Sequence, residues 1–343
     1  MAEVTGTGRS QDTAEAELDS LDTMPATTYR LRGSRARPVD ETVDVTWSIA
    51  MVGVNRSARA ASGSAPLLGR GRFELGEVLG GGGMGVVFRA LDHELSRQVA
   101  IKFLQPSHKL TGAARLELLR SEARAVAKLN HPNIVQVYDL GIAPDGQPYL
   151  VMELIEGESL RVALDRGPLS LHDAVQVADQ LLEGLSHAHA ARILHRDLKP
   201  SNVLRERSGR VAILDFGLAG LDEGGPCIAG TPPYMAPEQW QGAAQDMRTD
   251  LWSFAVLVFE MLTGERPFQG RTLTELREAA LIADPFAHRP TEDPRLPAPV
   301  ARVLSRALEK SPARRYQSAS ELQAALRRAA SAPAAAPPRA LLP

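Results

Sequence analysis

The sequence predicts an α+β protein in which a small antiparallel sheet comes first and a larger, mainly helical part follows. Residues 73–104 and 134–153 contain short segments that alternate between apolar and polar side chains, as half-buried strands do. From residue 170 onward, apolar residues recur with the spacing of amphipathic helices. Residues 150–157 change from apolar to polar and end at Gly157, which suits a connector between two lobes.

The composition is that of an ordinary soluble globular protein. The chain has 343 residues, of which 44% are hydrophobic and 23% charged, and its net charge of −2 gives no indication of a nucleic-acid or membrane partner. The single cysteine, Cys227, cannot form an internal disulfide, which fits a reducing compartment. No signal peptide begins the chain, and the most apolar run, Leu251 to Leu262, is too short to span a bilayer. We therefore expect a cytoplasmic protein without a membrane span.

Both ends of the chain have the composition of segments that do not fold. Residues 1–72 mix Ser, Thr, Ala, Gly and Arg with acidic residues and show no sustained periodicity. So few large apolar side chains cannot offset the entropy that ordering costs, and we expect this region to be disordered. Residues 329–343 are rich in Ala and Pro and are expected to form a flexible tail.

The first predicted hairpin contains a glycine-rich turn. Residues 73–79 alternate like a strand, residues 80–85 read Gly-Gly-Gly-Gly-Met-Gly, and residues 86–90 resume as a strand. A turn between two strands differs from the strand-to-helix turn of dinucleotide and Walker motifs. Glycines let backbone N–H groups approach a phosphate closely, although a glycine run by itself is more often only a turn. The residues that match the pattern G-x-G-x-x-G-x-V are Gly80, Gly82, Gly85 and Val87.

The next apolar strand, residues 99–102, ends on a lysine. Residues 115–129 then read as a helix with one apolar face, and Glu122 lies beside that face. We expect Glu122 to pair with Lys102 and to aim the ammonium group at the α- and β-phosphates of a nucleotide. Glu117, on the same helix, is the competing partner.

A second hairpin precedes the connector. Residues 134–140 and 147–153 are predicted strands around Asp145-Gly146, a favoured turn pair. In the connector, the free backbone groups of Glu153 and Ile155 could bind an adenine edge.

Helices dominate the remainder of the chain. Ser170 is the predicted cap of a helix that runs to about residue 190. The further predicted helices cover residues 250–262, 273–282, 299–309 and 320–329.

A charged loop follows the first of these helices. The seven residues Arg-Asp-Leu-Lys-Pro-Ser-Asn contain Asp197, Lys199 and Asn202. Asp215 follows the next predicted apolar strand. Asp197 could orient a hydroxyl and accept its proton, and Lys199 could neutralise a moving phosphoryl group. Asn202 and Asp215 could hold Mg²⁺. The alternative for this loop alone is a surface segment of solvated charges.

Taken together and in this order, the motifs resemble those of eukaryotic-type protein kinases over residues 73 to about 328. The resemblance is strongest to bacterial serine/threonine kinases, because of residues 83–87, 131–135 and 230–239. It implies a bilobal kinase fold with an N-lobe (73–152), a hinge (153–157) and a C-lobe (158–328). It also implies ATP and Mg²⁺ as cofactors, Mn²⁺ as a substitute metal, proteins bearing Ser or Thr as substrates, and a homodimer for autophosphorylation.

The resemblance assigns further roles by position. Met152 would be the gatekeeper behind the adenine, which Val87, Ala100 and Leu204 would enclose. Asp250 would anchor the backbone of the catalytic loop. Glu238 would form a structural ion pair with Arg315.

One departure from the family concerns activation. The arginine at the position of Arg196 commonly binds a phosphate on the activation loop, yet residues 218–230 contain no Ser or Thr. We expect either that Asp222 or Glu223 stands in for the phosphate, or that the loop is ordered without one. Thr231 is expected to contact the catalytic loop.

Two other functions compete with an active protein kinase. A catalytically silent pseudokinase would be expected to lack a key residue, but Lys102, Asp197, Asn202 and Asp215 are all present. A small-molecule kinase of related fold is disfavoured by Ala236-Pro237-Glu238 and the helices after it, which shape a peptide-binding surface in protein kinases.

Overall fold

The computed structural model describes residues 67–82, 85–104, 113–216, 230–287, 293 and 295–332. All of them belong to one of the two units into which the chain divides, Val39–Pro343. The predicted disorder of residues 1–66, the flexibility of residues 333–343 and the roles of Asp222 and Glu223 lie outside the described residues.

The described part begins before the predicted first strand. Leu67 and Leu68 form a short strand, β1, that pairs antiparallel with Glu74 and Phe73 of β2. The prediction of disorder is therefore wrong for residues 67–72. The buried side chain of Leu68 explains the difference, because one leucine anchored on the sheet can order a stretch that has no periodicity.

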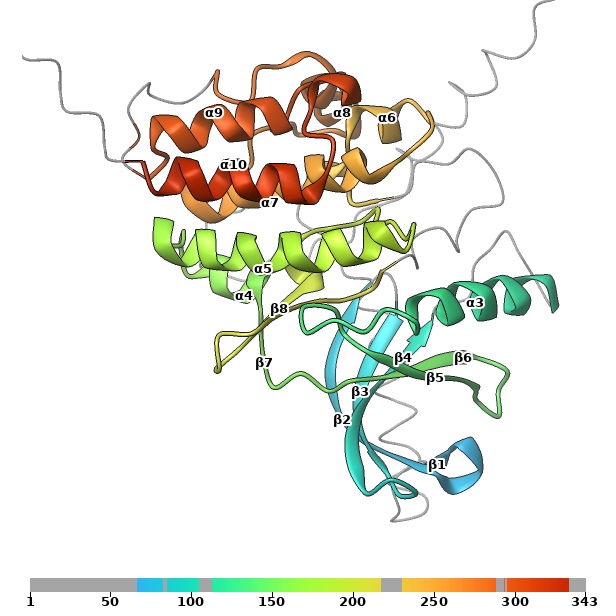
Figure 1. Ribbon diagram of the computed structural model, residues 1–343. Helices are drawn as coiled ribbons and strands as arrows, with labels where there is room; N and C mark the ends of the chain where they lie inside the picture. Colours follow the sequence, from blue (N-terminus) through green and yellow to red (C-terminus); the bar gives the residue numbers. More distant parts are fainter. Residues whose placement is uncertain are drawn as a thin grey trace, which may run out of the picture. The chain divides into compact units, whose positions relative to one another are not determined.

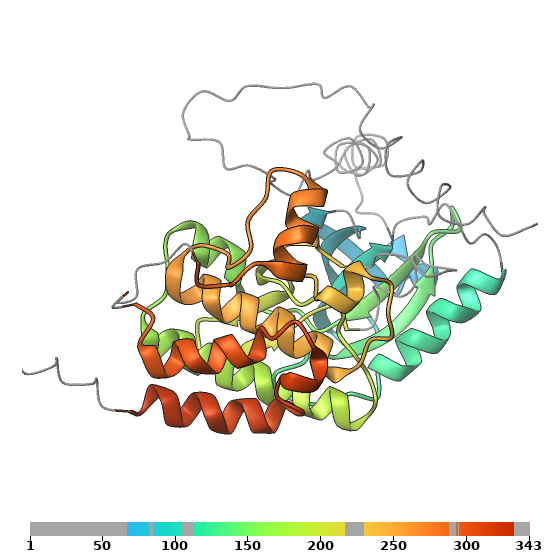
Figure 2. The same ribbon diagram turned by 90° about the horizontal axis from the view of Figure 1, so that it is seen from above.

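The first lobe is a six-stranded antiparallel sheet with one helix. The strand order is β1-β2-β3-β4-β6-β5. Figures 1 and 2 both show α3 running beside the sheet. The elements are β2 Phe73–Gly82, β3 Gly85–Asp92, β4 Arg97–Leu104, α3 Ala113–Val126, β5 Val137–Ile142 and β6 Pro148–Met152.

Aromatic side chains fill one face of this sheet. Phe103 of β4 packs edge-on against Phe88 of β3, with ring centroids 5.6 Å apart, and lies 5.9 Å from Tyr149 of β6. All three are buried, as alternation along the strands predicts.

The second lobe is mainly helical and is built around α7 (Met247–Thr263), which is buried along almost its whole length. Its N-cap is Asp246, which accepts a hydrogen bond from Arg248 N, so the helix begins slightly before the predicted Asp250. Ser170 caps α5 (Leu171–Ala190) through Asp173 N, which confirms that prediction. The other helices are α4 Leu160–Asp165, α6 Pro237–Trp240, α8 Leu273–Ile282, α9 Ala298–Ala307 and α10 Ala319–Ala330.

A small three-stranded sheet lies between the helices and the first lobe. It consists of β7 Gly157–Ser159, β8 Val203–Glu206 and β9 Val211–Ile213. Figure 1 shows this sheet beside α4 and α5, on the side that faces β2 and β3. None of the described helices combines the length and apolar character that crossing a bilayer requires.

Two segments of the chain are among the contacts that join the two lobes. One is the connector after β6. The other is the loop between α3 and β5, where Ile134 forms a parallel bridge with Ile213 instead of extending the predicted hairpin. In that loop Asn133 Nδ2 donates to Val211 O at 2.7 Å and to Gln180 Oε1 at 2.9 Å. The buried amide of Asn133 thus attaches this loop to β9 and α5.

Candidate active site

Asp250, at the start of α7, binds the backbone of the catalytic loop, residues 195–202. Its carboxylate accepts hydrogen bonds from His195 N at 2.9 Å and from Arg196 N at 2.8 Å. His189 Nε2 lies 2.8 Å from the same carboxylate. Burial alone would raise the pKa of Asp250, but the hydrogen bond and charge of His189, aided by His195, hold it below its ordinary value. The predicted anchoring role of Asp250 is confirmed.

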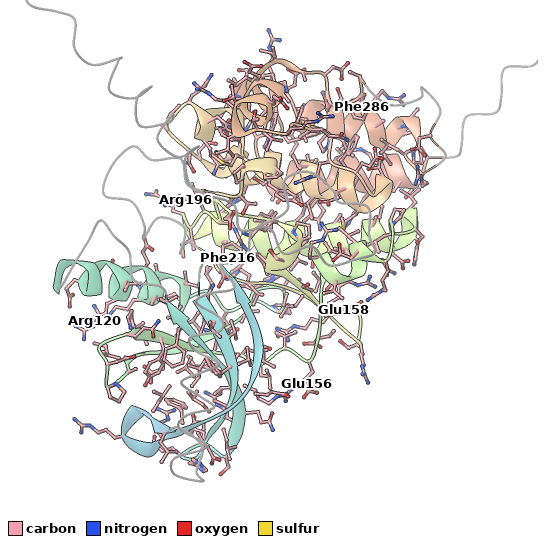
Figure 3. The ribbon with its side chains drawn as sticks, turned by 180° about the vertical axis from the view of Figure 1, so that it is seen from behind. Arg120, Glu156, Glu158, Arg196, Phe216 and Phe286 are labelled. Atoms are coloured by element: carbon pink, nitrogen blue, oxygen red, sulfur yellow. The ribbon has the colours of Figure 1, made fainter. Side chains whose placement is uncertain are left out.

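The anchored backbone is strained where it turns. Arg196 has φ of 66°, a left-handed conformation that is uncommon for a residue other than glycine. Its carbonyl accepts a hydrogen bond from Gln239 Nε2 at 2.9 Å. Figure 3 labels Arg196 and Phe216 where the helical lobe faces the sheet, and Glu156 and Glu158 on the connection between the lobes. Strain of this kind persists only where surrounding bonds hold it, as those to Asp250 and Gln239 do here.

Asp197 sits in a closed hydrogen-bond network. Its Oδ1 accepts from Thr231 N at 2.7 Å, and its Oδ2 lies 3.1 Å from Lys199 Nζ. Lys199 Nζ also donates to Thr231 Oγ1 at 2.6 Å. Asn202 Nδ2 donates to the Asp197 carbonyl at 2.9 Å. Asp197 is 3% exposed, and the contacts with Thr231 and Lys199 fix the direction of its carboxylate. The predicted contact of Thr231 with the catalytic loop is confirmed.

Asn202 and Asp215 carry the oxygen atoms suited to a magnesium ion. Asn202 uses its Nδ2 toward Asp197, so its amide oxygen remains as the atom to offer a metal. The carbonyl of Asn202 accepts a hydrogen bond from Leu214 N at 2.9 Å, which joins the two segments predicted to hold the metal. Within the described ranges no cluster of three His, Cys, Asp or Glu side chains could hold a metal ion. A site with few protein ligands fits Mg²⁺, which keeps waters and takes phosphate oxygens.

The expected pairing of Lys102 with Glu122 is wrong in this structure. Lys102 Nζ donates to Asp215 Oδ2 at 2.6 Å, and both side chains are largely buried. Glu122 Oε2 is buried and has no hydrogen-bond partner among the described residues. The competing candidate, Glu117, pairs instead with Arg120 at 2.8 Å on the exposed side of α3. The physical reason is competition, because Asp215 reaches the ammonium from the other lobe and neutralises it.

The environment of Glu122 matches that of an unpaired carboxyl group. Burial raises its pKa to about 7, and the positive charge of Arg196 opposes this shift only in part.

The side chains predicted to enclose an adenine lie together. They form one apolar cluster with contributions from both lobes, in which Ala100, Met152 and Ile155 are buried. The partly buried members include Val87 from β3 and Leu204 from β8.

The connector presents backbone groups next to this cluster. Glu153 N donates to Gln136 O at 2.9 Å. Within the described ranges, neither the carbonyl of Glu153 nor the N–H of Ile155 has a backbone partner. These two groups are therefore available to bind the polar edge of an adenine, as predicted for the connector.

The glycine-rich turn closes the β2–β3 hairpin. Gly80 pairs with Val87 and Gly82 with Gly85, whereas residues 83–84 lie outside the described residues. Gly85 has φ of 132°, and a Cβ atom there would lie 1.8 Å from Phe103 O. Gly85 is therefore required sterically, while a Cβ on Gly80 would meet nothing within 4 Å.

Two buried ion pairs support the site from the helical lobe. Arg315 Nη1 and Nη2 each donate to Glu238 at 2.7 Å, which confirms the predicted pair. Glu260 of α7 is not among the site residues predicted from the sequence. It accepts from Tyr234 Oη at 2.6 Å and from Arg161 Nη1 at 2.8 Å. Its signal in the sequence was a single carboxylate inside the most apolar helix, where an unpaired charge would be costly.

Comparison with known proteins agrees with this geometry. The family model for the protein kinase domain matches residues 73–326. A probable serine/threonine-protein kinase of Streptomyces coelicolor is 38% identical over 74% of this chain and 39% of its own length. Serine/threonine-protein kinase PrkC of Bacillus subtilis is 34% identical over 76% of this chain and 40% of its own, and PknB of Mycobacterium tuberculosis is 38% identical over 74% and 42%. The chain therefore spans less than half the length of these relatives. By its matching domain and these relatives, it belongs to the protein kinase family.

Proposed function

We propose that this protein is a serine/threonine protein kinase that transfers the γ-phosphoryl group of ATP to hydroxyl groups of proteins. The observation that carries the proposal is the network around Asp197, which fixes a buried carboxylate beside Lys199, Thr231 and Asn202. An immobilised carboxylate next to an ammonium group can orient a hydroxyl and accept its proton.

The other site residues take complementary roles in this proposal. Asn202 and Asp215 would hold Mg²⁺, which supplies charge neutralisation for the phosphates when it is bound. Mn²⁺ would serve as a substitute metal. The backbone of the glycine-rich turn, with Gly80, Gly82 and Gly85, would cover the phosphates. The remaining nucleotide contacts are assigned to the adenine cluster of Val87, Ala100, Met152, Ile155 and Leu204 and to the backbone of Glu153.

Lys102 must change partner for this reaction. In the structure its ammonium neutralises Asp215, so the metal ligand and the phosphate ligand are paired with each other. Pairing with Glu122 would free the carboxylate of Asp215 for the metal and turn Lys102 toward the α- and β-phosphates.

An assay with γ-labelled ATP, with and without a generic protein substrate, tests the proposal. Labelling of the protein itself or of the substrate, lost in the Asp197→Asn variant, is the expected result. ATP binding without any transfer would indicate a pseudokinase. Transfer only to small molecules would indicate a small-molecule kinase of related fold. Autophosphorylation, a homodimer that supports it and a cytoplasmic location belong to the same proposal.

A further inference from the structure

We propose that Arg210 is a positioning residue for nucleotide binding, which acts by clamping the side chain of Glu153 to the helical lobe. Arg210 lies in the turn just before β9, between the segments of Asn202 and Asp215, and is not part of any sequence motif described above. The inference rests on the proposed function in one respect, that the backbone of Glu153 and Ile155 binds the adenine edge.

The contact between Arg210 and Glu153 is bidentate. Arg210 Nη1 lies 2.6 Å from Glu153 Oε1, and Nη2 lies 3.0 Å from Glu153 Oε2. Two parallel charge-assisted hydrogen bonds fix both the distance and the plane of the carboxylate. The hydrogen bond with Glu153 is the largest cause that raises the pKa of Arg210 above its ordinary value.

The same guanidinium group reaches two more segments. Arg210 Nε donates to Pro132 O at 2.6 Å, in the loop between α3 and β5. Arg210 Nη1 also lies 2.9 Å from Glu206 Oε1, at the end of β8. One side chain therefore joins the connector, the α3–β5 loop and the β8–β9 turn. Arg210 and Glu153 are 26% and 23% exposed, so solvent screens this contact less than a fully exposed pair.

Gln136, in the α3–β5 loop, also restrains Glu153. The N–H of Glu153 donates to Gln136 O at 2.9 Å, and its carboxylate accepts from Gln136 N at 3.3 Å. A residue fixed at its amide and at its carboxylate has little freedom left at Cα. The direction of the Glu153 carbonyl, which is proposed to face the adenine, follows from these restraints. Substituting Arg210 removes one of these restraints on Glu153. Arg210 itself is not among the residues proposed to contact the nucleotide.

The chain offers a matched control for this test. Arg327 of α10 also makes a two-nitrogen contact with one carboxylate, that of Asp179 on α5. That pair joins two helices of the same lobe and contacts neither the connector nor the α3–β5 loop. Arg327→Gln removes a comparable ion pair and should leave nucleotide binding unchanged.

The experiment measures the dissociation constant of ATP with Mg²⁺, together with KM for ATP and kcat, for the full chain. For Arg210→Gln we expect the dissociation constant and KM to rise roughly 3- to 30-fold, while kcat changes by less than about twofold. This is less than the roughly 10- to 150-fold cost of losing a charge-assisted hydrogen bond outright, because Arg210 acts on the nucleotide only through Glu153. Arg210→Lys should restore part of the affinity only, because an ammonium cannot reproduce the planar fork. Combining Arg210→Gln with Glu153→Gln should cost no more than the first change alone, since both remove one interaction.

Three outcomes would overturn the inference. One is an unchanged dissociation constant in a folded Arg210→Gln protein. Another is a parallel loss of kcat and thermal stability, which indicates a purely structural residue. The third is full additivity of the two substitutions. If the unsubstituted protein itself fails to bind ATP, the proposed function fails instead, so the two failures are distinguishable.

Discussion

Lys102 Nζ lies 2.6 Å from Asp215 Oδ2, while the buried Oε2 of Glu122 has no hydrogen-bond partner among the described residues. A lysine of the sheet is thus neutralised by the helical lobe, and a half-buried carboxyl group of α3 has only the charge of Arg196 to oppose the effect of its burial. This relationship makes the stability of the protein depend on pH.

The first prediction concerns Glu122 and pH. Burial raises its pKa from 4.5 to about 7 in the folded protein. The unfolded chain therefore loses this proton first as pH rises, and folding stability falls through that interval and stays lower above about 7. Glu122→Gln has no such titration. We expect the difference in Tm between Glu122→Gln and the unsubstituted protein to grow in favour of the variant from about pH 5 to about pH 8. Thermal unfolding followed by circular dichroism provides the measurement, and a pH-independent difference would contradict it.

The second prediction concerns the proton acceptor. Asp197→Asn keeps the shape of the side chain but removes its basicity. We expect kcat to fall roughly 10²- to 10⁴-fold, the usual scale for losing a general base, with ATP affinity largely retained. Steady-state kinetics alongside a direct ATP-binding measurement separates the two effects. Near-normal turnover would contradict the assignment of Asp197 as the proton acceptor.

The third prediction concerns the buried pair of Arg315 and Glu238. The side chains are 0% and 6% exposed, and Thr249 Oγ1 also donates to Glu238 at 2.8 Å. Arg315→Ala leaves a buried carboxylate without its cation, which should cost about 3–5 kcal/mol of unfolding free energy. Urea denaturation measures this loss. Arg327→Ala, on the exposed side of α10, should lower stability far less, and equal losses would show that burial is not the cause.

The fourth prediction concerns activation. Residues 218–230 contain no Ser or Thr, so no hydroxyl there can carry a phosphate for Arg196 to bind. Treatment of the purified protein with a phosphatase should therefore leave its kinase activity largely unchanged. Phosphosite mapping by mass spectrometry accompanies the assay. Abolished activity, with the responsible phosphate between Asp215 and Glu238, would refute the idea.

Much of the site could be predicted because its parts are local. The segment from Arg196 to Asn202 holds Asp197, Lys199 and Asn202 within seven residues. The roles of Asp250, Val87 and Ala100 rested on the family resemblance, and Asp250 reaches its partners from more than 50 residues away. The partnership of Glu238 with Arg315 rested on the family resemblance, and the structure confirms it.

The partners of Lys102 and Arg210 could not be predicted in the same way. An ammonium group takes whichever carboxylate the packing of the lobes brings nearest, and no local pattern distinguishes Asp215 from Glu122. Arg210 stands in a polar turn where most arginines are solvated, so nothing in the sequence marks it as the partner of Glu153. Long-range choices of this kind depend on how the elements are placed, which periodicity does not contain.

The attachment of the α3–β5 loop through Asn133 has a mechanical consequence. The connector and Asn133 both attach the sheet to the helical lobe, and the ion pair of Lys102 with Asp215 joins the same two lobes again. Any rotation of one lobe against the other must therefore either keep these contacts close to its axis or break them.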